Sequence, residues 1–178
     1  MPEEVALAYG RAVYANDADA IWRLVSAADR RVKDEATFRR QQRDLHGFAR
    51  EAVHQLAGFT AATPVTTTIN GDRASTVLRF RLPDANSPLL KELLHDWDED
   101  RLNALADGER ARIRARLAEL HRQATLPLVE GDEAIELVRE GGRWKIFLNW
   151  AGGVRVGFEV AMDPEVPLQV TLTPEAAI

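Results

Sequence analysis

Two stretches in which apolar and polar residues alternate constrain the fold of this chain more than any other feature of its sequence. Residues 63–69 and 73–82 are separated by Asn70-Gly71, a dipeptide typical of two-residue hairpin turns. The alternation in the second stretch places the following residues on one face: Ala74, Thr76, Leu78, Phe80 and Leu82. The sequence therefore predicts a β-hairpin with one buried face and one face in water.

Strand patterns resume later in the chain. Residues 126–129 and 133–139 read as strands, and Gly141-Gly142 separates them from a strand at 143–150 that puts Trp144, Ile146 and Trp150 on one face. Further alternation covers residues 154–162 and 168–172. These runs predict an antiparallel sheet, because the connections between neighbouring strands are short.

Helical periodicity dominates the beginning of the chain. Residues 2–14 predict a first helix, residues around 21–25 a short second helix that ends in the polar stretch 26–33, and residues 34–56 a third and longest helix. Residues 83–123 interrupt the strands with two more helical segments, the first acidic and the second rich in arginine. Their opposite charges favour an antiparallel helical hairpin.

Composition excludes several classes of protein. A net charge of −5 over 178 residues gives no general attraction to nucleic acid, and no apolar run reaches the length of a membrane span. The absence of cysteine removes disulfides, thiolate nucleophiles and cysteine-based zinc sites. We expect a soluble, cytoplasmic protein without a cofactor, unless an export signal has been trimmed from the sequence.

The order of elements resembles the nuclear transport factor 2-like superfamily, which has a cystatin-like cone and includes SnoaL-like proteins. The likeness is carried by VALAY at residues 5–9, ADAIWRLVS at 18–26 and EAIELVREGGRWKI at 133–146. It implies three N-terminal helices packed on a curved antiparallel sheet, a ligand pocket at the mouth of the cone, and a homodimer formed through the outer face of the sheet. The expected fold class is then α+β, with residues 1–162 as one cone-like domain, the insertion at 83–123, and a C-terminal edge strand or linker at 163–178.

Five residues are candidates for a site. His46 lies on the edge of the apolar stripe of the long predicted helix, where it is a candidate proton carrier, although Asp44 two residues earlier cannot orient it on a helix. Aromatic rings suit a ligand pocket, and the candidates of this kind are Tyr14, Trp22, Trp97 and Trp150. Each of these rings also fits an ordinary core position.

Other motifs give little chemistry. The acidic run at 96–100 lacks the glycine that a calcium loop needs at its sixth position, and His95 and His121 lack zinc-ligand spacing. No acid, base and nucleophile combine at a recognisable spacing. The sequence thus leaves two hypotheses: a non-catalytic module that binds a small ligand or another protein, and a cofactor-free lyase or isomerase that uses His46.

Overall fold

The computed structural model describes residues 1–152 and the backbone of 160–161 and 169–170. The chain forms two compact units. The first unit comprises Met1–Arg43, Ala61–Arg81 and Glu130–Gly157, and the second comprises Asp44–Thr60, Leu82–Val129 and Phe158–Ile178.

The first unit begins with four helices: α1 (Pro2–Tyr14), α2 (Ala18–Leu24), α3 (Ala27–Val32) and α4 (Glu35–Gln41). Three of them begin at a polar side chain that accepts a hydrogen bond from a backbone N–H of the first turn. These capping residues are Asp17, Ser26 and Asp34. The caps explain why the chain changes direction so often within a polar stretch.

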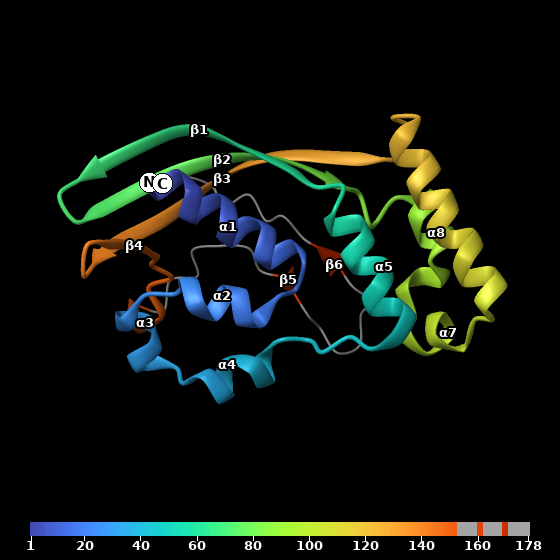
Figure 1. The fold of residues 1–178 in the computed structure, drawn as a ribbon, viewed down its shortest axis with the longest axis horizontal. Helices are drawn as coiled ribbons and strands as arrows, with labels where there is room; N and C mark the ends of the chain where they lie inside the picture. The colour runs from blue at the N-terminus through green and yellow to red at the C-terminus, as the bar shows by residue number, and fades with distance from the viewer. Residues whose placement is uncertain (153–159, 162–168, 171–178) are drawn as a thin grey trace. The chain divides into compact units, whose positions relative to one another are not determined.

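A four-stranded antiparallel sheet follows, in the order β1 (Ala61–Asn70), β2 (Arg73–Pro83), β3 (Leu128–Glu140) and β4 (Arg143–Ile146). Figure 1 shows β1, β2 and β3 as long curved strands with α1 beside them. The expected α+β class with an antiparallel sheet is confirmed. The two strands expected at 126–129 and 133–139 are instead the single strand β3.

The two faces of the sheet differ as the alternation predicts. The inner face is defined by Ala74, Thr76, Leu78 and Phe80 of β2, which are at most 3% exposed, and by Ile135 and Leu137 of β3. The α1 helix packs closely enough here that a Cβ atom on Gly10 would lie 3.0 Å from the Phe80 ring. The outer face carries the residues between these positions.

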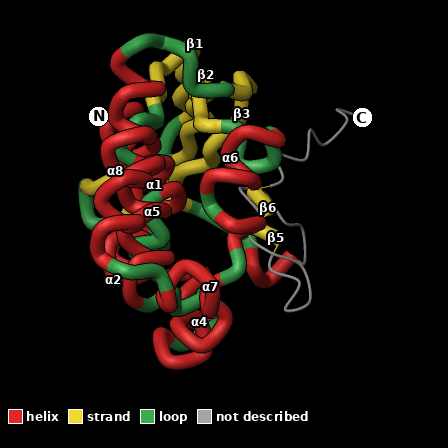
Figure 2. Tube along the Cα trace, turned by 90° about the vertical axis from the view of Figure 1, so that its right-hand side faces the viewer, coloured by secondary structure: helices red, strands yellow, loops and turns green. Residues whose placement is uncertain are grey.

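The second unit contains α5 (Gly47–Ala57), α6 (Pro88–Leu93), the 3-10 turn η1 (His95–Trp97), α7 (Glu99–Ala104) and α8 (Asp107–Arg122). Figure 2 draws α5, α6, α7 and α8 in the colour of helices. Their apolar faces form one core that includes Phe48, Leu94, Trp97, Leu102 and Leu117. The short strands β5 (Val160–Ala161) and β6 (Gln169–Val170) pair antiparallel.

The single long helix expected at 34–56 is wrong. Residues 42–46 separate α4 from α5, and α5 begins at Gly47 with a φ of +58°, a conformation that glycine adopts without steric cost. A Cβ atom at Gly47 would lie 2.7 Å from Asn103 Oδ1, whose oxygen accepts the Ala49 N–H at 3.1 Å. Close packing against α7 therefore requires glycine and begins a new helix there.

The insertion is also more divided than a two-helix hairpin. Between the expected segments, which correspond to α6 and α8, lie η1 and α7, and His95, Asp96 and Trp97 all have positive φ values between 50° and 61°. The strands expected at 154–162 and 168–172, and the C-terminal segment 163–178, lie outside the described residues apart from β5 and β6. None of the helices in the described residues has the length and apolar character needed to cross a bilayer.

Candidate functional site

A carboxyl group lies among the apolar side chains of the inner face. Glu133 is in phase with the buried Ile135 and Leu137 on β3, whereas Asp132 and Glu136 face the other way and contact Arg79 and Ser75 on the outer face. Glu133 is half-buried, and its burial raises the pKa from 4.5 to about 7. This carboxyl therefore changes between its protonated and ionised forms near neutral pH.

Two tyrosines of α1 lie near Glu133. Burial raises the pKa of Tyr9 and Tyr14 above the usual value for a phenol, and the negative charge of Glu133 raises both further. Tyr14 packs edge-on against Phe80 of the inner face, with ring centroids 5.3 Å apart. Both phenols consequently keep their protons at physiological pH and are suited to donate a hydrogen bond.

A second buried carboxyl, that of Asp29, has a structural role. Asp29 is 1% exposed, and its carboxylate accepts hydrogen bonds from Ser26 Oγ at 2.7 Å and from the backbone N–H groups of Leu148 and Trp150 at 2.8 Å. These bonds hold the chain just after β4. They explain why the strand expected at 143–150 ends at Ile146, so that Trp150 does not lie on the strand.

By holding the chain after β4, the hydrogen bonds of Asp29 bring two of the aromatic candidates together. The rings of Trp22 and Trp150 stack with centroids 6.5 Å apart, and Phe38 lies 5.4 Å from Trp22 and 6.0 Å from Trp150. Lys33 Nζ lies 4.3 Å from the centroid of the Trp150 ring. The rings of this aromatic cluster contact one another and one cation, an arrangement typical of side-chain packing within a fold.

His46 lies in the second unit, at the N-cap of α5, with a side chain that is 70% exposed. Its Nε2 is 3.8 Å from Asp44 Oδ2, a contact that the predicted helix would not allow but the observed loop does. Its backbone N–H donates to Glu99 Oε1 at 3.0 Å. An imidazole this exposed lacks the apolar surroundings that the proton-carrier hypothesis requires.

Trp97 belongs to the core of the second unit. It is 4% exposed, and its indole N–H donates to the Ala85 carbonyl at 3.0 Å. The acidic run around it caps helices, since Asp98 accepts the Arg101 N–H at 3.1 Å at the start of α7. His121 stacks on Phe59 with centroids 4.1 Å apart.

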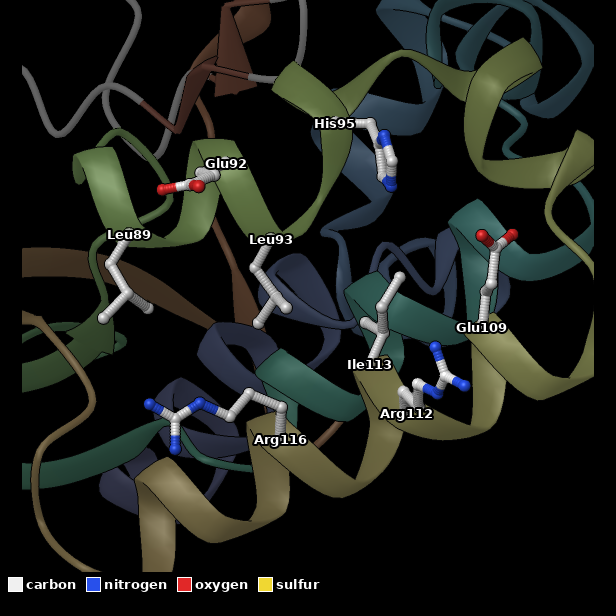
Figure 3. Close-up of a pocket in the computed structure, with 8 residues that line it drawn as sticks. All are labelled: Leu89, Glu92, Leu93, His95, Glu109, Arg112, Ile113 and Arg116. Carbon is white, nitrogen blue, oxygen red and sulfur yellow. The ribbon is translucent and has the colours of Figure 1, made fainter.

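A groove of about 420 Å³ lies between α6 and α8 (Figure 3). Leu93 and Ile113 lie between the two helices, and the charged side chains surround them. The full lining is Leu89, Glu92, Leu93, His95, Glu109, Arg112, Ile113 and Arg116. Arg116 is paired with Glu119 at 3.0 Å, and Glu92 and Glu109 point in different directions. The charges of this groove do not converge on one point.

The five candidates therefore do not form one site. Tyr14 lies near Glu133, Trp22 and Trp150 form the aromatic cluster, and Trp97 is a core residue. The sequence did contain a signal for Glu133, because an acid two and four residues before Ile135 and Leu137 shares their face. The signal for Asp29 was a Ser26-x-x-Asp29 pair at the start of a helix.

The comparisons with known proteins concern the fold. No protein-family model matches the chain, and no curated protein matches it. Among solved structures it is similar to a protein provisionally described as an NTF2-like transpeptidase from Campylobacter jejuni. The two are 11% identical with a TM-score of 0.38, and the match covers 83% of this chain and 98% of the other. The α+β description rests on the helices and sheet of the chain itself.

Proposed function

We propose that the chain is a cofactor-free lyase or isomerase whose site is the inner face around Glu133, Tyr9 and Tyr14. The observation that carries this proposal is the half-buried Glu133, whose pKa of about 7 places it between its protonated and ionised forms at neutral pH. A general acid or base works best with a pKa near the working pH. His46, the proton carrier expected from the sequence, is replaced by Glu133 in this role.

The tyrosines have a complementary role in the proposal. Removing a proton beside a carbonyl group leaves negative charge on the carbonyl oxygen, and a nearby hydrogen-bond donor stabilises that charge. A phenol whose pKa is raised remains a donor throughout the physiological range. We therefore assign Glu133 as the base and the half-buried Tyr14 as the donor, with a small, largely apolar carbonyl compound as the substrate class.

A non-catalytic ligand-binding module is the second candidate. On β3 the half-buried Glu133 shares its face with the apolar side chains of Ile135 and Leu137. A partly exposed carboxyl beside apolar side chains suits a small ligand that needs one polar contact. The same residues would then bind without turnover.

Hydrogen exchange separates the two candidates. A panel of small ketones and enones is incubated with the protein in D2O, and deuterium incorporation is followed by mass spectrometry. We expect the wild-type protein to exchange hydrogen of a panel compound for deuterium. Glu133→Gln should abolish this exchange. Glu136→Gln should retain it, because Glu136 lies on the same strand but contacts Ser75 on the outer face. Binding of a panel compound without exchange would favour the module, and exchange that survives Glu133→Gln would contradict the proposal.

A further inference from the structure

The two edges of the sheet are built differently. β4 is four residues long and contains Arg143 and Lys145. Val25 forms a parallel bridge with Ile146, and the Ser26 N–H donates to the Ile146 carbonyl at 2.8 Å. Shortness, charge and cover by another segment are the devices that protect a sheet edge from further pairing. The β4 edge is therefore closed to a new strand.

The β1 edge has few of these devices. β1 is ten residues long and contains no Asp, Glu, Lys, Arg or His. It pairs with β2 alone among the described strands, and Figure 1 shows it as the outermost strand of the sheet. Val65 and Ile69 are 49% and 52% exposed. An exposed, uncharged edge of this length is a template for another strand.

Only the first half of β1 carries a protective irregularity. Pro64 lacks a backbone N–H, and the register with β2 shifts between Pro64 and Thr66. From there the register is regular, from Thr66 opposite Val77 to Asn70 opposite Arg73. In a regular antiparallel strand, alternate residues direct their N–H and carbonyl groups away from the existing partner. Residues 66–70 therefore present backbone groups at the free edge that pair with none of the strands in the described part of the chain.

We propose that residues 66–70 of β1 are an association surface for a second copy of the chain, and that two copies pair β1 to β1, antiparallel, about a two-fold axis. Identical strands can meet in this way because neither carries charge, so no like charges face each other. The threonines at 66, 67 and 68 also suit cross-strand pairing with one another. Because the β4 edge is covered, association ends at two copies.

This interface differs from the outer face through which the family resemblance implies a dimer. On the outer face, Arg79 pairs with Asp132 through two contacts of 2.8 Å, and Arg81 pairs with Glu130 at 2.6 Å. Burying that face would remove water from four charged groups that already have partners. Pairing at β1 removes water from no charged side chain of residues 66–70.

The first test is sedimentation over a wide concentration range. Five-residue edges bury less than the ~1,200 Å² of a standard interface, so we expect a dissociation constant on the order of micromolar. Ile69→Lys should raise this dissociation constant at least about tenfold, because the like-charged lysines of the two copies then lie near the two-fold axis. Val32→Lys is the matched control, since Val32 is 51% exposed and belongs to α3, which Figure 1 shows apart from β1. It should leave the dissociation constant unchanged.

A second test does not depend on the stability of the lysine variant. The chain has no cysteine, so single-cysteine variants report proximity without background. Thr66→Cys, Thr67→Cys and Thr68→Cys should form a covalent dimer on mild oxidation, fastest at the residue nearest the axis, whereas Val32→Cys should not. A protein that stays monomeric at all concentrations, that dimerises despite Ile69→Lys, that grows beyond two copies, or that crosslinks equally fast through Val32→Cys would overturn the proposal.

Discussion

Removing the Asp29 carboxylate should destabilise the first unit more than any other single change to a polar side chain of its helices. Asp29→Ala leaves the backbone N–H groups of Leu148 and Trp150 without their acceptor, and both bonds are 2.8 Å long. It also removes the partner of Ser26 Oγ at 2.7 Å. All three bonds meet at a side chain that is 1% exposed.

The magnitude follows from these contacts. A buried donor left without a partner costs about 1–3 kcal/mol, so two backbone donors and a hydroxyl give a loss of at least about 3 kcal/mol for Asp29→Ala. Asp29→Asn keeps the volume and one acceptor oxygen, so we expect about half of that loss. Asp34→Ala is the control, because Asp34 is an exposed aspartate that caps α4 through the Thr37 N–H. Its effect should be clearly smaller than that of either Asp29 variant.

Urea unfolding measured by tryptophan fluorescence provides the assay. Trp22 and Trp150 stack on each other, so the released segment should also shift the emission of the folded protein towards longer wavelength in Asp29→Ala. A loss of less than ~1 kcal/mol, or one equal to that of Asp34→Ala, would show that the carboxylate does not hold the segment after β4.

Four further results are expected. Burial raises the Glu133 pKa from 4.5 to about 7, so the folded protein binds the carboxyl proton more tightly than the unfolded chain does. The free energy of unfolding therefore falls as the pH rises from 4.5 to about 7. Urea melts should therefore find Glu133→Gln more stable than wild type by about 1–2 kcal/mol above pH ~8, with little difference below pH ~4. Phe80→Ala should lower the free energy of unfolding by about 3–5 kcal/mol, and Gly10→Ala by about 1–3 kcal/mol through its clash with the Phe80 ring, both measured in the same melts. His46→Ala should leave deuterium exchange unchanged, since its side chain is 70% exposed.

The strands of the first unit were predictable because alternation is a local signal. The phase of β2 placed Leu78 and Phe80 in the core, where they are 0% and 1% exposed. The turn after Asn70 was equally local, since Gly71 has a φ of +59°. Trp144, which the alternation put on one face with Ile146, is only half-buried, and the Arg139 guanidinium lies 5.0 Å from its ring centroid.

Helix boundaries depended on partners that are distant in sequence. Continuous helical periodicity hid the break before Gly47, which is set by the close approach of Asn103. The break before α3 has a similar origin, because Val25 is extended and forms its bridge with Ile146. Periodicity records which residues are apolar but contains no information about which distant backbone will pair with a given segment.

The candidate site was predictable only in part for the same reason. Tyr14 was singled out as an aromatic residue, but its neighbour Glu133 is far away in the sequence. Only the order of the strands and the packing of α1 bring the two near each other. His46 was selected from the phase of a helix that does not include it.

The central claim is that burial raises the Glu133 pKa to about 7, and an NMR titration of the side-chain carboxyl carbons tests it most directly. The Glu133 signal is identified as the one missing from the spectrum of Glu133→Gln. Because burial on the inner face disfavours the ionised form, its midpoint should lie near pH 7. A midpoint close to the ordinary glutamate value of 4.5 would contradict the account, since the carboxyl would then be ionised at neutral pH and too weak a base for the proposed role.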